Sequence, residues 1–560
     1  MINELRNYMR MNNPERHLIS RIRWGLLFML FYFQNDLLKA QDTTRSQTIQ
    51  IISNYKPVLR SATKLSFSAS PLPPAPFSDK FRYTLPDQQF KVIMKPVELV
   101  PATFQPDSIK FTNHHFLKLG YGNFQRIYAD AGTTWGTGKP LQFQLMAGYH
   151  SLNGDLLFQQ HQRIYADASA QVFRNNHRFN TKASFGQRNY YFFGADSVNI
   201  NAKQDSLRQT FNLFSVEVDL SNNEPGQFGL HYRPAIKTSL FSDRNSTEWN
   251  LLFRLPISVR IGNQLLFSFQ ANADLTGYRP KDTLAYTNHI VSFYPSVAFP
   301  FRDFKFDLGG QLAWDQGTLK FLPQMGIEAF VHSNRAIIMA GWKSSIRKNN
   351  YQQLTELNPW ICQPMAQFNT RIDEVFAGLR GDLPRNIHYR FRAGVTNFHS
   401  QPLFVNVKQL SVFDILYEKS LQTLHVNAAA EWLRSEKIST GFSLDYYQFI
   451  RQKEADKPWH FVPLELNFSV RWKPLPQLIV QSRIYAWQGA YALKDTLGAY
   501  KKLSSVVDAN LEADYRLSKF FTVWLQINNL FNQAYERWNR YPVVGFQVVG
   551  GIRLNFVQNK

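Results

Sequence analysis

The closing stretch of the chain decides the fold: residues 521–528 read FTVWLQIN and residues 546–556 read FQVVGGIRLNF. In both runs apolar side chains alternate with mostly polar ones, and a period of two is the pattern of a β-strand with one apolar face. Outer-membrane β-barrels close with such a strand. We interpret the second run as the barrel-closing strand and insertion signal, carried by Phe546, Val548, Ile552, Leu554 and Phe556.

Composition agrees with a barrel that faces lipid. Phe, Tyr and Trp make up 15% of the 560 residues, and a barrel needs aromatic residues for the girdles at its two membrane interfaces. The mean hydropathy is −0.33, and the sequence has no apolar run of about twenty residues that would span a membrane as a helix. The predicted class is all-β, a transmembrane antiparallel barrel.

The start of the chain predicts a secretory signal peptide over residues 1–40. Arg16, Arg21 and Arg23 precede ten apolar residues at 24–33, and a cleavage site follows Ala40. The Ala-Gln junction resembles signal peptides of Bacteroidota. Residues 41–110 are rich in proline and predict an irregular leader, periplasmic or lumenal, without a folded plug. The barrel is expected over residues 111–556, within an outer membrane.

Alternating runs recur from residue 115 to residue 556 and predict about 22 strands, within a range of 16 to 22. Connection lengths test this count, because short periplasmic turns alternate with longer external loops in such barrels. Counting back from residue 556 makes 529–544 and 488–504 external and 473–477 a turn. The count is consistent only if residues 405–417 belong to an external loop. Prolines within the runs should lie near strand ends or bulges; they are Pro234, Pro256, Pro295 and Pro323.

The two faces of the predicted wall differ in chemistry. The outward face is apolar, as in Leu464, Leu466, Phe468, Val470 and Trp472. The inward face carries charges that either form a ladder of salt bridges or favour anions in the lumen; the candidates are Lys118, Arg178, Lys182, Arg254, Arg390, Arg392, Arg471, Arg483, Asp508, Glu512 and Arg553. Aromatic residues at 190–193 and around Trp360 and Trp487 are interpreted as girdle residues, with sugar stacking as the alternative.

The remaining features limit the function classes. The formal net charge is +22, which predicts an anionic partner. Because a secreted barrel does not meet nucleic acid, we expect this partner to be lipopolysaccharide, peptidoglycan or an anionic solute. Cys362 is the single cysteine, so the sequence predicts no internal disulfide and no cysteine metal site. The sequence has no HExxH, GxSxG, Walker A or EF-hand spacing. We therefore expect no enzyme and no cofactor.

Residues 528–536 (NNLFNQAYE), followed by Trp538, Tyr541 and the terminal strand, resemble the C-terminal end of TonB-dependent receptors. Residues 117–123 (LKLGYGN) resemble the first barrel strand of plug-less, receptor-like barrels of Bacteroidota. The resemblance implies a 22-stranded barrel. A TonB-dependent transporter carries a folded plug before its barrel, and the leader at 41–110 shows no plug motif.

Three functions fit these observations. The first is a passive or accessory channel for solutes. The second is a scaffold subunit of an outer-membrane complex, with a secretion, assembly or surface-lipoprotein partner. The third is a TonB-dependent transporter with a degenerate plug. In each case outer-membrane lipid and lipopolysaccharide surround the barrel, and the barrel-assembly machinery is the expected partner for insertion.

Overall fold

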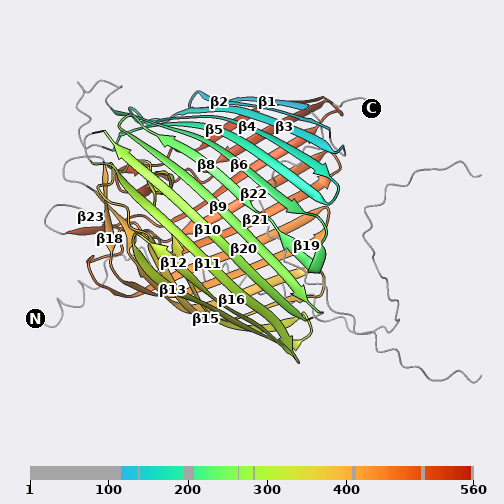
Figure 1. The fold of residues 1–560 in the computed structure, drawn as a ribbon. Helices are drawn as coiled ribbons and strands as arrows, with labels where there is room; N and C mark the ends of the chain where they lie inside the picture. Colours follow the sequence, from blue (N-terminus) through green and yellow to red (C-terminus); the bar gives the residue numbers. More distant parts are fainter. Residues whose placement is uncertain are drawn as a thin grey trace, which may run out of the picture. The chain divides into compact units, whose positions relative to one another are not determined.

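The wall of the molecule is one closed antiparallel sheet, seen in Figure 1 as tilted strands that wind around a barrel. The computed structural model describes residues 115–136, 139–194, 207–262, 264–281, 284–406, 412–493 and 499–556. The predicted signal peptide and leader lie outside these residues. The sheet has 23 strands; β7 and β8 follow one another along the same edge of β9 and count as one wall element, which leaves 22. The predicted strand count is confirmed.

Strand bounds follow the alternating runs closely. The first half of the wall consists of β1 (His115–Gly122), β2 (Arg126–Trp135), β3 (Leu141–Asn153), β4 (Gln160–Arg174), β5 (His177–Tyr191), β6 (Arg208–Asn222), β7 (Leu230–Tyr232), β8 (Ala235–Ser242), β9 (Ser246–Ile261), β10 (Leu265–Pro280), β11 (Tyr286–Phe301) and β12 (Phe304–Asp315). The second half consists of β13 (Thr318–His332), β14 (Ala336–Arg347), β15 (Thr370–Leu383), β16 (Ile387–His399), β19 (Leu421–Ser435), β20 (Ile438–Gln452), β21 (Leu464–Leu475), β22 (Leu478–Trp487), β25 (Val506–Arg516), β26 (Phe521–Asn528) and β29 (Gln547–Phe556).

Smaller elements lie in the connections. In the described part of the chain, three hairpins stand apart from the wall: β17 (Gln401–Asn406) with β18 (Phe413–Glu418), β23 (Tyr491–Leu493) with β24 (Tyr500–Lys502), and β27 (Glu536–Trp538) with β28 (Tyr541–Pro542). A short helix, α3 (Tyr351–Leu357), follows β14, and a 3₁₀ turn, η2 (Gln227–Gly229), precedes β7. No helix in the described part of the chain is long and apolar enough to cross a membrane. β17 and β18 pair with each other and not with the wall, so the described residues of 405–417 form no wall strand, as predicted.

The connections divide between the two ends of the barrel as predicted. At one end, here the turn end, they are short, as at 302–303, 436–437 and 476–477. At the other end, here the loop end, they reach the lengths of 400–420 and 529–546. Figure 1 shows β18 and β23 together at the loop end. Because long loops are external in outer-membrane barrels, the loop end corresponds to the cell exterior.

The four strand prolines coincide with interruptions of the ladder, because proline has no N–H to donate. Pro234 separates β7 from β8, and Pro256 lies on β9 opposite this gap. Pro295 falls where β11 and β12 leave a stretch unpaired. Pro323 immediately precedes Gln324, where pairing of β13 with β14 begins. Three of these prolines lie inside their strands rather than at strand ends, and each is tolerated because only one of its two edges is interrupted.

The seam between the first and last strands is held by a tryptophan. β1 pairs with β29 over the whole of β1, and β29 also pairs with β26, which closes the barrel. Trp524 of β26 lies across this seam, and its Nε1 is 3.2 Å from the carbonyl oxygen of Leu119 and 3.3 Å from that of Ile552. A Cβ at Gly120 would stand only 2.3 Å from the indole, so the ring fits because this position is glycine.

Candidate functional site

The two faces of the wall carry different side chains, as the alternation predicts. Leu119, Phe214, Leu240, Val375 and Trp472 are among many large apolar side chains exposed on the outer face. The predicted lumen charges alternate along their strands with such apolar residues, as Lys118 does beside Leu119. Exposed tryptophans at both ends of the wall, such as Trp135, Trp249, Trp314 and Trp472, have the positions of interface aromatics.

Several of the predicted inward cations contact carboxylates on nearby strands. Lys118 Nζ is 3.4 Å from Glu512, Lys182 Nζ is 3.5 Å from Asp167, and Arg254 Nη2 is 2.7 Å from Glu217. Arg392 pairs with Glu374, and its guanidinium lies 4.4 Å from the centre of the Phe376 ring. The Lys182–Asp167 and Arg254–Glu217 pairs are accessible to solvent, and such pairs contribute at most about 1 kcal/mol each. They fix side-chain positions more than they stabilise the barrel.

The other predicted site residues have varied surroundings. Arg553 lies over the Phe116 ring at 4.9 Å, and the Nε of Arg178 is buried without a hydrogen-bond partner. Arg390 is the register partner of Arg380, and Arg483 is the register partner of Asn510. Arg471 pairs in register with Gln481.

Asp508 is buried and holds a loop, whereas the sequence predicts it as a charge that lines the lumen. Its side chain is fully buried and accepts hydrogen bonds from the Tyr485 hydroxyl at 2.7 Å and the Phe531 N–H at 3.1 Å. Since Phe531 belongs to the 529–546 loop, this carboxylate holds the loop against the wall.

The middle of the inner wall keeps substantial accessibility. The side chains of Lys182 and Asp167 are 52% and 35% exposed, and those of Arg254 and Glu217 are 43% and 31% exposed. All four positions lie near the middle of their strands. The described residues therefore do not fill the barrel at this level.

The loop end is different, because loops from around the barrel meet there in one apolar core. We call this core the loop cap; its buried members are Phe211, Phe241, Tyr278, Tyr351, Leu354, Ile361, Phe404, Phe413, Trp538 and Tyr541. Three members lie on the wall strands β6, β8 and β10, and the others come from the connections 348–369, 400–420 and 529–546. These elements are far apart around the wall, so the loops cross the opening to reach one another. Each fully buried aromatic side chain contributes about 1.5–3 kcal/mol.

The girdle interpretation is wrong for Tyr190, Phe193 and Trp360. Tyr190, Phe193 and Trp360 pack against the loop cap instead of facing lipid. Trp360 stacks on Tyr541 with ring centres 4.0 Å apart, and Phe193 meets the same tyrosine edge-on at 4.9 Å. Their partners lie far away in the sequence, which local pattern alone does not show.

Buried polar groups pin the 348–369 connection inside the loop end. The Glu248 carboxylate accepts hydrogen bonds from the backbone N–H of Tyr351 at 2.7 Å and of Gln352 at 3.1 Å. Asn350 caps α3 by accepting from the Gln353 N–H. Lys348 is buried against Asp274, with its Nζ 2.8 Å from the backbone oxygen of that residue. The connection is thus fixed at its entry and along its helix.

A second carboxylate joins two other loops. Glu418 is fully buried and accepts hydrogen bonds from the backbone N–H groups of Ser420, Lys453, Glu454 and Ala455. Burial raises the pKa of Glu418, but hydrogen bonds from these four donors outweigh burial, and the pKa is lowered. The ionised carboxylate therefore ties the 400–420 loop to the 453–463 loop.

His460 is the point at which four loops meet. Its Nδ1 is 2.7 Å from the Phe404 carbonyl oxygen, and its Nε2 accepts from the Asn539 N–H at 3.3 Å. Its backbone N–H donates to Tyr491, and its backbone oxygen accepts from Arg537. Burial lowers the pKa of His460 to about 3, and the nearby Arg537 adds to this effect. A neutral imidazole protonated at Nδ1 satisfies both ring contacts.

Sequence reasoning did not identify Glu248, Glu418 or His460. Their hydrogen-bond partners lie between two and more than one hundred residues away in the sequence, and none of the three belongs to a recognisable motif. Within the described ranges, no group of three or more His, Cys, Asp or Glu could hold a metal ion.

Comparison with known proteins gives the fold but no close relative. No protein family model and no curated protein matches the chain. The FrpB iron transporter from Neisseria meningitidis (F3-3 variant) matches with a TM-score of 0.61 and 12% identity, over 79% of this chain and 81% of that chain. The pyoverdine receptor FpvA from Pseudomonas aeruginosa PAO1 matches with a TM-score of 0.61 and 9% identity, over 79% of this chain and 78% of that chain. The siderophore receptor PirA from Acinetobacter baumannii matches with a TM-score of 0.61 and 8% identity, over 79% of this chain and 80% of that chain.

These neighbours are TonB-dependent receptors, so the resemblance noted at residues 528–536 is confirmed at the level of the barrel fold. They are transporters and receptors, not enzymes. At 8–12% identity, the likeness between these proteins and this chain is one of fold, a large closed β-barrel.

Proposed function

We propose that the protein is a gated accessory channel, in which the loop cap closes the external end of a solute-accessible barrel. The observation that carries the proposal is the contrast between the two levels of the barrel. Charged side chains at the middle of the wall remain accessible, whereas aromatic residues at the loop end are buried against one another. Passage through such a barrel requires the cap to open.

The inner charges support an anion preference as part of this proposal. Arg380, Arg390 and Arg392 lie within two rungs of one another on β15 and β16. Glu328 and Glu374 pair with the first and third of these arginines, and Arg390 makes no direct ion pair with any described residue. A solute anion would gain a favourable interaction at Arg390 without displacing a carboxylate.

Conductance of the full-length protein in planar bilayers tests the proposal. We expect a low-conductance wild type, and larger steps after Trp538→Ala with Tyr541→Ala, which removes two buried rings from the cap. Phe214→Ala is the matched control, because this ring is exposed on the outer face. A salt gradient then gives the selectivity, and Arg390→Gln should lower the preference for anions. If the cap is shown open by hydrogen exchange and the barrel still does not conduct, the channel proposal fails.

A scaffold subunit is the second candidate, and the rigid construction of the cap favours it. Glu248, Glu418 and His460 hold the loops in one arrangement, which suits a surface that binds a protein partner. Co-purification in mild detergent tests this function, with loss of the partner expected in the cap variant. A barrel that purifies alone from native membranes would count against it.

Two further expectations concern partners. The alternating residues Phe546, Val548, Ile552, Leu554 and Phe556 are proposed as the signal for the barrel-assembly machinery. A transporter with a degenerate plug would require TonB to bind residues 41–110, and a binding assay with the C-terminal domain of TonB tests this.

A further inference from the structure

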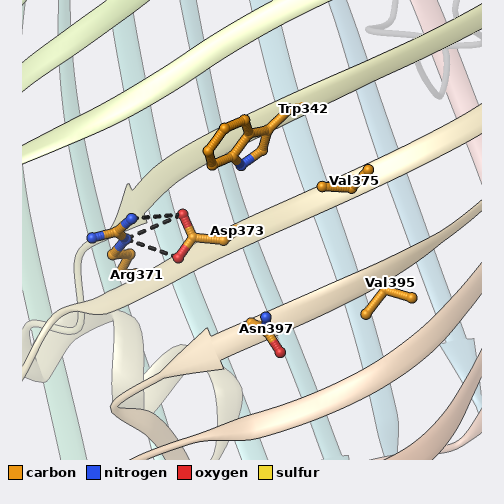
Figure 2. Close-up of a pocket in the computed structure, with 6 residues that line it drawn as sticks. All are labelled: Trp342, Arg371, Asp373, Val375, Val395 and Asn397. Carbon is orange, nitrogen blue, oxygen red and sulfur yellow. Dashed lines mark hydrogen bonds and ion pairs between the residues drawn. The ribbon is translucent and has the colours of Figure 1, made fainter.

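The outer face of the wall carries a hollow between β14, β15 and β16, close to the loop end. Its volume is about 310 Å³. Figure 2 shows the side chains that line it, which are Trp342, Arg371, Asp373, Val375, Val395 and Asn397. This hollow is separate from the lumen and from the loop cap.

The lower part of the hollow belongs to the lipid-facing surface. Trp342, Val375 and Val395 are register partners on the three strands and form one rung. They are 43%, 58% and 39% exposed, as expected for side chains that face hydrocarbon. The hollow therefore opens directly into the membrane, and an acyl chain is the molecule that this environment supplies.

The upper part of the hollow is charged. One rung above, Asp373 pairs in register with Ser344 and Asn397, and on the next rung Arg371 pairs with His399. Arg371 donates from Nε and Nη2 to Asp373 over 2.8–3.1 Å, as Figure 2 shows by dashed lines. Charges on the lipid face cost about 2–4 kcal/mol at the membrane centre and about 0–1 kcal/mol near the interface. These residues therefore mark the level of the lipid head groups.

Arg371 and His399 keep N–H groups that can bind an anion from outside the protein. Both Asp373 oxygens are engaged by Arg371, and one also accepts from the Ser344 hydroxyl at 2.5 Å, so this carboxylate orients the guanidinium. Arg371 Nη1 has no hydrogen-bond partner among the residues that the structure describes. The His399 side chain is 47% exposed, with Nε2 3.5 Å from Asp373. Guanidinium and imidazole N–H groups are suited to bind a phosphate.

We propose that this hollow binds one phosphate-bearing lipid of the external leaflet. The acyl chain lies on Trp342, Val375 and Val395, and the phosphate is bound by Arg371 Nη1 and His399. The binding is independent of solute transport, since the residues lie on the opposite face of the wall from the inner charges.

Native mass spectrometry of the delipidated full-length protein tests the proposal. The probes are a diphosphoryl lipid A, phosphatidylethanolamine, phosphatidylcholine and inorganic phosphate, added at equal concentrations. The wild type should retain one phosphoryl lipid per barrel. Arg371→Ala should weaken retention at least about tenfold through loss of the charged hydrogen bond. Val375→Trp should also weaken it, because the added ring fills the hollow.

Arg279→Ala is the matched control, since Arg279 is an outward-facing arginine near the loop end of β10 that does not line the hollow. It should bind lipid as the wild type does. Retention unchanged in both Arg371→Ala and Val375→Trp would overturn the proposal. The proposal would also be overturned if inorganic phosphate saturated the site equally well in the wild type and in Val375→Trp. That result would show a site for an ion alone, without an acyl chain. Loss of a co-purifying protein in Arg371→Ala, with lipid retention unchanged, would instead assign the surface to a protein partner.

Discussion

Acidification should open the loop cap through His460. The pKa of this residue is about 3 in the folded protein and about 6.5 in an unfolded chain. Between these two values the unfolded state binds a proton that the folded state does not bind. Stability of the cap is therefore fully present above about pH 6.5 and falls as the pH drops toward 3.

The size of the effect follows from the shift. Each pH unit below 6.5 removes about 1.4 kcal/mol, so the cap loses about 3 kcal/mol at pH 4.5 and about 5 kcal/mol at pH 3. The physical cause is that an imidazolium at His460 would be buried against Trp538 and Phe413 and would face Arg537. Protonation at Nε2 would also remove the acceptor that Asn539 N–H uses.

Hydrogen exchange of the loop peptides in lipid nanodiscs measures this loss. Exchange of residues 453–463 and 529–546 should accelerate about 100-fold between pH 7 and pH 4.5, after correction for the intrinsic pH dependence of exchange. His460→Gln cannot titrate and should abolish most of this dependence, whereas His332→Gln, on a strand end at the turn end, should leave it unchanged. An equal pH dependence in His460→Gln and the wild type would refute the assignment to this residue.

Three further substitutions test other parts of the structure. Glu418→Leu leaves four backbone donors without their acceptor at about 1–3 kcal/mol each, so protease cleavage within 453–463 should increase sharply while the barrel remains intact. Phe468→Arg places a charge on the lipid face and should cost about 2–4 kcal/mol in urea unfolding from vesicles, whereas Asn467→Arg, on the inner face, should cost less than 1 kcal/mol. Trp524→Ala should cost about 3–5 kcal/mol in the same assay because the ring is fully buried across the seam, and an unchanged midpoint would argue against its stapling role.

The barrel could be predicted from the sequence because its determinants are local. Alternation of apolar and polar residues gives each strand, and the lengths of the connections give the parity that excludes residues 405–417 from the wall. The same alternation separates Phe468 from Asn467 without knowledge of any contact. The alternating runs at 141–150 and 165–173 predict shorter strands than β3 and β4, which continue to pair with each other beyond both runs.

The loop cap could not be predicted in this way. Trp360 and Tyr541 stack although 180 residues separate them, and no periodicity encodes such a contact. Charged residues on the outer face were also missed, because Arg371 and Asp373 occupy the same alternating positions as Val375, a face that the pattern predicts to be apolar. The signal that could have revealed them is a pair of opposite charges two positions apart on the apolar face of a strand.

The mutual packing of the loops has a consequence for sequence divergence. Surface loops usually change freely, because each makes few contacts with the rest of the protein. Here Phe404, Phe413, Trp538 and Tyr541 come from two loops but share one core. A substitution in one loop therefore demands a compensating change in the other, so the external surface should evolve as a single unit.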